Sequence, residues 1–320
     1  MEFFNLILTP IKWVIELVLV AWHWVFTQLG LPADSGAAWV LSLLGLVVVV
    51  RGAMIPLFVK QIRSQRKMLE IAPELKRIQA KYKGKRDQYS MQAQQREMSA
   101  LYAKHGTSPF ASCLPLLIQM PIFFGLFTVI QHAANTPDLP GVGLMTPELN
   151  NQFASATIFG APLSTTFTAA VEAGGPYQVF ILAPILVALM ITSQFITQLQ
   201  IVSKNTTDEI KNSPTFRMQR IMLYVFPLAF LFSGAFFPMG LVIYWVFTNL
   251  WTMTQQFIVI RNAPTPGTPA ARAKAERDAA RRARKGIVDE PEAPAVEAPT
   301  KAQRQQPVGK NRAKKQGGKK

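Results

Sequence analysis

The sequence has little of what enzymes commonly use. Its 320 residues include one Cys and three His, and only 16% of them are charged. A single Cys excludes a disulfide framework and a cysteine zinc site, since either needs at least a pair. Gly-rich phosphate loops, His-Glu-x-x-His motifs and nucleophile elbows are also absent from the sequence. The sequence therefore predicts no metal, no cofactor, no catalytic residue, and a protein that is not an enzyme.

The charge that is present is unevenly placed along the chain. The net charge is +16, yet 49% of the residues are apolar. Residues 60–109 hold twelve basic and four acidic side chains, and residues 261–320 hold sixteen and six. Long apolar stretches that alternate with basic ones indicate a membrane protein and not a soluble basic one.

Five apolar stretches are long enough to cross a hydrocarbon layer about 30 Å thick as helices. They are residues 39–59, 110–132, 179–201, 221–237 and 241–260. The last two are joined by Pro238-Met239-Gly240, so we expect them to form an antiparallel hairpin. The predicted fold class is all-α, a polytopic membrane helix bundle with five transmembrane helices in a core of residues 37–261.

The placement of Lys and Arg predicts the orientation of this bundle. The segment 133–178 contains neither residue, whereas 60–108 is rich in both. The positive-inside rule therefore makes 133–178 an extracytoplasmic loop, and it makes 60–108 and the C-terminus cytoplasmic. The Pro-, Ala- and Lys/Arg-rich tail, 262–320, is predicted to be disordered, with a basic helix at 270–285 when an anionic partner binds.

The N-terminal segment, residues 1–36, allows two interpretations. Its apolar part, 6–29, is long enough to span, but it carries Lys12, Glu16 and His23 together with three Trp residues. Charged residues and clustered Trp favour an amphipathic helix that lies in the outer membrane interface. A sixth transmembrane helix is the alternative.

The cytoplasmic segment 60–108 has the apolar periodicity of two helices. Pro73 fits the first turn of one helix, Gly84 ends it, and a second helix runs to about Lys104. We expect a helical hairpin with a narrow apolar seam that includes Met68, Leu75, Ile78, Met91 and Met98. Two roles fit this seam, namely packing of the two helices against each other and capture of varied apolar partners by the polarizable Met side chains.

Arg51 is the only charged residue of the stretch 39–59. A charge at this depth costs on the order of 2.5 to 3.5 kcal/mol, and none of the five stretches contains an acidic residue that could pair with it. We therefore predict a hydrophilic groove, open to the cytoplasm, that receives a polypeptide segment. An Arg51 that only holds the bundle together, and a channel or anion transporter that uses Arg51, are the alternatives. Polar or aromatic neighbours are available at Gln119, Thr192, Ser193, Gln194, Gln198, Tyr244, Trp245, Thr248, Asn249, Gln255 and Gln256.

Four motifs in this order resemble the YidC family of bacterial membrane protein insertases, which has mitochondrial and chloroplast relatives. They are RGAMIPL at 51–57, APELKRIQ at 72–79, CLPLLIQMPIF at 113–123 and FPMGLVIYW at 237–245. The resemblance covers about residues 5–261 and implies the five-span form. It implies a multi-pass insertase and chaperone of the bacterial plasma membrane that works alone or with the Sec translocon.

The resemblance also implies roles for individual residues and partners. Arg51 matches the groove arginine, which attracts acidic residues in the tail of a substrate. Gln194 resembles a groove-lining residue of the third span, Trp245 an aromatic groove residue of the fifth, and the hairpin a substrate-capture element. The implied partners are nascent membrane proteins, the ribosome, the Sec translocon and the signal recognition particle receptor. For the basic tail, anionic lipids are the alternative to the ribosome.

Overall fold

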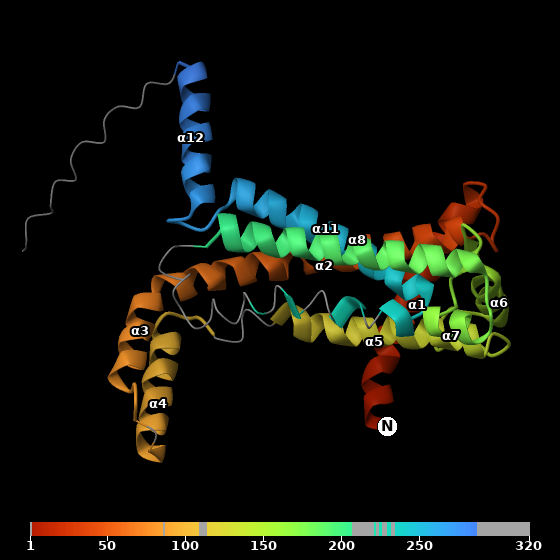
Figure 1. Cartoon of the computed structure of the whole chain (residues 1–320), viewed down its shortest axis with the longest axis horizontal. Helices are drawn as coiled ribbons and strands as arrows, with labels where there is room; N and C mark the ends of the chain where they lie inside the picture. Colours follow the sequence, from red (N-terminus) through yellow and green to blue (C-terminus); the bar gives the residue numbers. More distant parts are fainter. Residues whose placement is uncertain are drawn as a thin grey trace, which may run out of the picture. The chain divides into compact units, whose positions relative to one another are not determined.

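The computed structural model describes residues 2–85, 87–108, 114–206, 221, 224–225, 229–231 and 234–286. Nearly all of these residues are helical, and the one sheet is a two-stranded antiparallel ribbon (Figure 1). The predicted all-α membrane bundle is thereby confirmed. The elements in order are α1 (Glu2–Gln28), α2 (Gly36–Glu70), α3 (Ala72–Lys81), α4 (Gln88–Lys104), α5 (Leu114–Asn135), α6 (Pro147–Ser155), β1 (Thr157–Ile158), β2 (Ala161–Pro162), α7 (Phe167–Glu172), α8 (Tyr177–Lys204), α11 (Met239–Asn262) and α12 (Pro269–Arg284).

Four described helices are long and apolar enough to cross a membrane. They are Leu8–Gln28, Gly36–Ser64, Leu117–Asn135 and Tyr177–Lys204. The last three correspond to the first three predicted stretches, whereas the first shows that α1 also qualifies by length and composition. The predicted fifth stretch forms α11, which falls outside this set. Of the predicted fourth stretch, 221–237, residues 222–223, 226–228 and 232–233 lie outside the described part of the chain.

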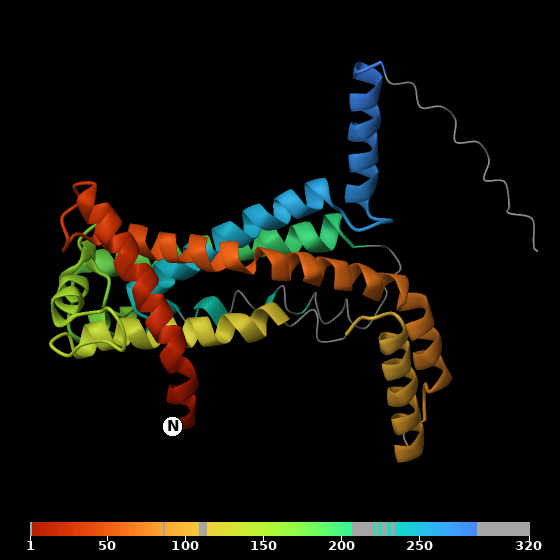
Figure 2. The ribbon, with the colours of Figure 1, turned by 180° about the vertical axis from the view of Figure 1, so that it is seen from behind.

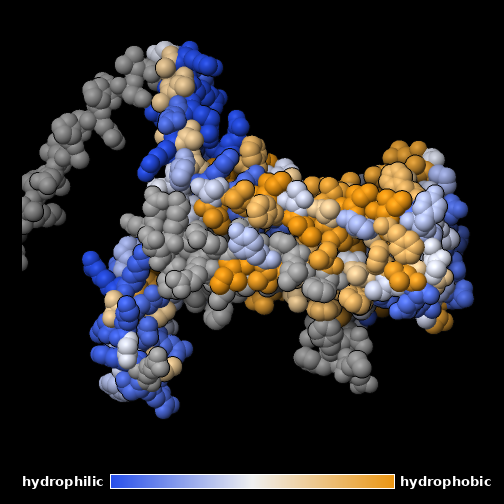
Figure 3. Space-filling view, viewed as in Figure 1, coloured by the Kyte–Doolittle hydropathy of each residue, from blue (hydrophilic) through white to orange (hydrophobic). Residues whose placement is uncertain are grey.

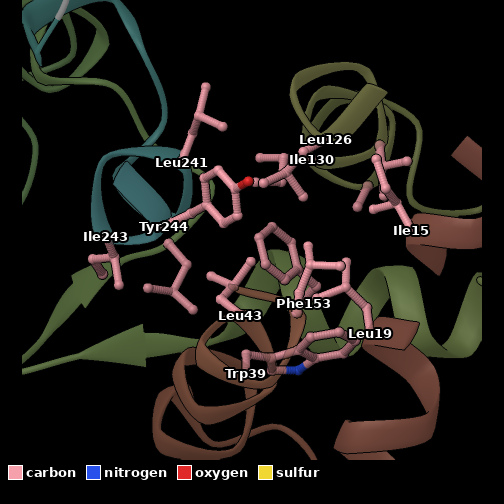
Figure 4. Close-up of a cluster of buried hydrophobic side chains, with 14 of the residues drawn as sticks. Ile15, Leu19, Trp39, Leu43, Leu126, Ile130, Phe153, Leu241, Ile243 and Tyr244 are labelled. Atoms are coloured by element: carbon pink, nitrogen blue, oxygen red, sulfur yellow. The ribbon is translucent and has the colours of Figure 1, made fainter. Parts of the chain in front are cut away.

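The main hydrophobic core lies where α1, α2, α5, α6 and α11 meet. Figure 4 shows Leu43 of α2, Leu126 of α5, Phe153 of α6 and Tyr244 of α11 converging in it. Close helix packing depends on small residues, because a Cβ at Gly45 of α2 would lie 2.5 Å from the Trp22 ring of α1. Figure 2 shows α1 running obliquely across α5 and α2, not parallel to them.

The remaining face of α11 packs against α8. Met190 of α8 is fully buried against Val242 and Val246 of α11, and Phe237 packs on the same cluster. The opposite face of α8 is exposed and apolar, and Figure 3 shows apolar side chains covering the outside of the bundle. An apolar outer surface over a packed core is the pattern expected of helices surrounded by lipid.

The predicted extracytoplasmic loop, 133–178, is a folded segment that contains α6, the β ribbon and α7. Its backbone is tied to the beginning of α11, because the amides of Met239 and Gly240 donate hydrogen bonds to the carbonyls of Thr165 (3.0 Å) and Leu163 (2.8 Å). These bonds satisfy two amides of the first helical turn, which have no partner within a helix. The segment thus holds one end of α11 in place.

The same segment is also tied to α1 through Glu16. The Glu16 carboxylate accepts hydrogen bonds from the amides of Val142 (3.0 Å), Gly143 (2.6 Å) and Met145 (3.2 Å). Glu16 is 2% exposed, and a Cβ at Gly141 would lie 2.7 Å from its carboxylate. A loop of backbone amides and small residues therefore encloses one carboxylate of α1, a contact that sequence analysis did not foresee.

The hairpin 60–108, predicted from its charges to be cytoplasmic, has the predicted helices. α3 carries Pro73 in its first turn, Gly84 adopts a φ of +87° in the turn that follows, and α4 ends at Lys104. α2 continues through Pro56 to Glu70, so one long helix connects the membrane core to the hairpin. Met91 is 59% exposed, so its predicted place in the self-packed seam is wrong.

A helix follows α11 where sequence analysis predicts a disordered tail. α12 begins after Thr268, whose fully buried side chain accepts a hydrogen bond from the amide of Ala271 (3.3 Å). Its Ala-rich sequence favours a helix, and α12 (Pro269–Arg284) falls where the sequence predicts a basic helix, 270–285, although only when an anionic partner binds. The division between the two compact units of the chain falls within α12, after Lys274, and residues 287–320 lie outside the described part.

Candidate functional site

Arg51 is buried in the middle of α2, with 7% of its surface exposed. Its guanidinium lies close enough to the Tyr244 phenol of α11 for an electrostatic interaction. Among the described residues no carboxylate pairs with it. A buried cation that lacks a neutralising anion is strongly attractive to any carboxylate that can reach it, because the surrounding dielectric is low.

Tyr244 links Arg51 to the second predicted span. The ring is 1% exposed, and its hydroxyl accepts a hydrogen bond of 3.4 Å from the Gln119 amide of α5. Arg51, Gln119 and Tyr244 thus come from three helices that are far apart in the sequence. The structure brings these three of the predicted groove residues together in one polar group.

Thr248 and Asn249 add polar groups one turn further along α11. They are 5% and 7% exposed, and neither the Thr248 Oγ1 atom nor the Asn249 Nδ2 atom has a hydrogen-bond partner. A buried polar group without a partner costs about 1 to 3 kcal/mol, so such atoms are commonly satisfied by water or by a bound molecule. The predicted site residue Thr248 is therefore available for a ligand.

Trp245 has a different environment from the one that sequence analysis predicts. Its half-buried ring stacks on Phe123 at a centroid distance of 4.9 Å and meets Phe230 and Phe237 edge to face, at 5.5 and 5.7 Å. Ring pairs of these geometries favour tight packing. Trp245 thus belongs to an aromatic cluster that joins α5 to α11.

The polar face of α8 is shifted by one residue from the predicted Gln194, which is half-buried. Ser193 and Thr197 are both 4% exposed, and their hydroxyls donate to carbonyls of their own helix at 3.0 and 2.8 Å. Ser193 was among the polar neighbours proposed from the sequence, but Thr197 was not. The spacing of four residues from Ser193 could have identified it, since such residues share a helix face.

The hairpin helices are joined by a small polar cluster. Glu97 of α4 accepts hydrogen bonds from Lys81 and from the Tyr82 hydroxyl, the latter at 2.8 Å, and these bonds lower the pKa of the Glu97 carboxyl. Asp87 caps α4 by accepting from the Ser90 amide at 2.8 Å, which lowers the pKa of Asp87. The predicted capture residues Met68, Leu75, Ile78 and Met98 are half-buried, whereas Met91 is exposed.

Metal binding finds no support in the part of the chain that the structure describes. No group of three or more His, Cys, Asp and Glu side chains there could hold a metal ion. What the described residues offer is one buried cation, Arg51, near the Tyr244 phenol, to which the Gln119 amide is bonded. This arrangement can bind an anionic or polar segment.

Comparison with known proteins agrees with the motifs. The family described as 60Kd inner membrane protein matches residues 31–266. A protein named membrane protein insertase YidC from Tropheryma whipplei (strain Twist) is 44% identical over 320 residues, which cover 98% of both chains. A protein of the same name from Bifidobacterium longum is 37% identical over 96% of this chain and 95% of its own length. Another from Streptomyces avermitilis is 40% identical over 86% of this chain and 62% of its own length. With a family match over most of its length and relatives of this identity, the chain belongs to the YidC family of 60Kd inner membrane proteins.

Proposed function

We propose that the protein inserts integral membrane proteins into the bacterial plasma membrane and assists their folding. Similarity to proteins named insertases over 98% of the chain supports the activity. The observation that carries the mechanism is Arg51, a buried intramembrane cation with no described carboxylate beside it. No nucleotide or cofactor enters this mechanism.

During insertion the substrate moves from water into the membrane, its polar tail toward Arg51 and its apolar segment into lipid. The polar tail of the substrate moves toward Arg51, because an acidic group there gains a favourable interaction in a low dielectric. Unpartnered groups such as Thr248 and Asn249 offer hydrogen bonds to the tail. The apolar segment then enters lipid, and burial of about 20 apolar residues supplies the driving force.

The substrate meets the hairpin before it reaches Arg51. α2 runs without a break from Gly36 to Glu70, and Ile71 at the base of the hairpin is 20 residues from Arg51, about 30 Å along a helix. Movement of the hairpin can therefore be transmitted along one rigid element. We assign substrate capture to Met68, Leu75, Ile78, Met91 and Met98, of which the exposed Met91 is the most accessible.

The orientation proposed from the charges extends to α1. Glu16, near the middle of α1, is bonded to residues 142–145, which belong to the proposed extracytoplasmic segment. A helix whose midpoint is held at that level lies at the outer interface, and the oblique course of α1 agrees with this placement (Figure 2). The C-terminus is then cytoplasmic, with five spans in between.

The Arg51 mechanism is tested by Arg51→Ala and Arg51→Lys in cells depleted of their own insertase. We expect Arg51→Ala to lower insertion of substrates with acidic tails about tenfold, equivalent to about 1.4 kcal/mol, and to spare neutral tails. Arg51→Lys keeps the charge and should retain much of the activity. The exposed Arg63 of the same helix provides the control variant Arg63→Ala. Equal insertion of both tails by all variants would overturn the electrostatic role.

The channel or anion transporter alternative has its own outcome in purified protein. An Arg51-dependent flux of small anions across liposomes, without a defect in insertion, would support it. The relatives named insertases make this the less favoured candidate.

A further inference from the structure

The turn between β1 and β2 has an unusual residue at its tip. Phe159 and Gly160 connect strands that pair in antiparallel register, with Ile158 opposite Ala161. Their φ angles are 51° and 81°, the geometry of a two-residue hairpin turn that favours Asn-Gly. Phe159 is the one non-glycine residue with positive φ in the described part of the chain. A bulky side chain is disfavoured in this conformation, because its Cβ crowds the backbone.

Packing within the protein does not compensate for this strain. The Phe159 side chain is 82% exposed. A strained residue persists when it serves a purpose at that position, and a large exposed aromatic side chain serves none for the folding of an isolated turn. The purpose of the ring therefore lies outside the chain.

The location of the turn indicates what it meets. A Cβ at Gly160 would lie 2.9 Å from the Gln178 side chain, so the turn lies against the first turn of α8. The exposed residues Tyr177 and Ile181 (68% and 56%) begin a row that continues along this candidate membrane span with Ile185 and Leu189. Figure 3 shows that much of the surface of the bundle is apolar on the face it displays.

The charge pattern around the turn favours lipid over other partners. Residues 149–171 and 173–203 contain no Asp, Glu, Lys or Arg. Trp and Tyr are enriched where a bilayer changes from headgroups to acyl chains because their rings are amphipathic, and Phe and Leu side chains of interfacial segments bury at the same boundary. An uncharged ribbon with an exposed ring, continuous with the lipid-facing surface of α8, matches that level of the membrane.

We propose that the Phe159 turn is a membrane anchor that inserts into the outer leaflet beside the beginning of α8. The assignment to the outer leaflet rests on the proposed orientation. The gain from placing the ring among lipids offsets the backbone strain, so Phe is kept where Asn or Gly would suit the turn better. The anchor fixes the depth of α8 and of the folded segment 133–178 in the bilayer.

Spin labelling in liposomes tests the location of the turn. Cys113→Ser removes the only thiol, and Phe159→Cys then carries a nitroxide label. Collisions with oxygen report lipid, and collisions with a water-soluble nickel chelate report solvent. We expect an oxygen-to-nickel ratio at least about threefold higher than for a label at Glu148→Cys, an exposed position on α6. Equal ratios at the two positions would overturn the proposal.

A second variant tests the anchoring itself. Asn tolerates positive φ, so Phe159→Asn should fold normally and lose only the ring. We expect a label at Tyr177→Cys to become more accessible to the nickel chelate in this variant, whereas an unchanged ratio would overturn the anchoring role. Neither measurement depends on insertion activity, so failure of the anchor and failure of the proposed function are distinguishable.

Discussion

At the scale of single residues, the polar group around Arg51 depends on Tyr244. The ring of Tyr244 fills the core where α2, α5 and α11 meet (Figure 4). Its hydroxyl accepts a hydrogen bond from Gln119, and its phenol interacts electrostatically with Arg51. The Tyr244 ring thus contributes to core packing, and its hydroxyl contributes to the polar group around Arg51. Removing the hydroxyl and removing the ring should therefore have separable effects.

The variant Tyr244→Phe removes the hydroxyl alone. We expect it to lower the stability of the protein in detergent by about 1 kcal/mol, the usual net contribution of one hydrogen bond. A double-mutant cycle with Gln119→Leu, followed by thermal unfolding, isolates the pair. If the two substitutions are additive, the hydrogen bond contributes nothing to stability.

At the scale of elements, two contacts hold helices to their neighbours by polar groups. One joins α1 to residues 142–145 through Glu16, and the other joins α3 to α4 through Glu97. The first is buried and the second is exposed. Substitution of Glu16 should therefore lower the stability of the protein strongly. The contact through Glu97 should instead respond to pH and salt.

Glu16→Ala removes the buried carboxylate that accepts from the amides of Val142, Gly143 and Met145. Because backbone donors without partners remain, we expect a loss of about 3 kcal/mol in the free energy of unfolding, with Glu16→Gln less harmful. Chemical unfolding in detergent measures the loss. Glu172→Ala, at an exposed carboxylate of α7, is the control. A change no larger than that of the control would show that the contact does not hold α1.

The hairpin should respond to acid. The pKa of Glu97 is lowered by its bonds from Lys81 and Tyr82, so its contribution to stability is present above the ordinary pKa of a Glu carboxyl. That contribution is lost as the pH falls through the lowered pKa in the folded hairpin. We expect lower amide protection factors in α3 and α4 in acid, after correction for the intrinsic pH dependence of exchange, and a weaker pH dependence in Glu97→Gln. An identical pH profile for both proteins would contradict this assignment.

At the scale of the whole molecule, charge is divided between regions with different partners. Residues 60–109 and 261–320 hold most of the basic side chains, and α12 carries several of them on a helix. We propose that the tail binds ribosomal RNA, with anionic lipid as the alternative. The Sec translocon and the signal recognition particle receptor remain proposed partners of the regions that we propose to be cytoplasmic.

A truncated chain that ends at Asn262 tests whether the tail binds ribosomal RNA or anionic lipid. We expect it to sediment with ribosomes less than the full-length protein does, and we expect the difference to shrink as salt is raised, because phosphate contacts release counterions. Liposomes that contain anionic lipid serve as the competing surface. Equal sedimentation of both chains would rule out ribosome binding by the tail.

Sequence patterns predicted features that depend on neighbours along the chain. The existence and approximate positions of α2, α5 and α8 follow from apolar length, although α2 runs past its apolar stretch to Glu70. The hairpin follows from Pro73, Gly84 and periodicity. The place of Met91 in a self-packed seam was predicted wrongly, and the helix predicted at 270–285 only with an anionic partner is α12. The first depends on how α3 and α4 meet, and the second on a buried cap at Thr268.

By itself the sequence determined the membrane bundle, the proposed sidedness and the isolated intramembrane charge of Arg51, because hydrophobic length and charge are local properties of a chain. Only the tertiary structure decided which groups meet that charge, where Glu16 binds and why Phe159 is exposed in a strained turn. Glu16 and Gly143, like Gln119 and Tyr244, are more than a hundred residues apart. Such contacts depend on how helices pack, and periodicity along the chain does not encode them.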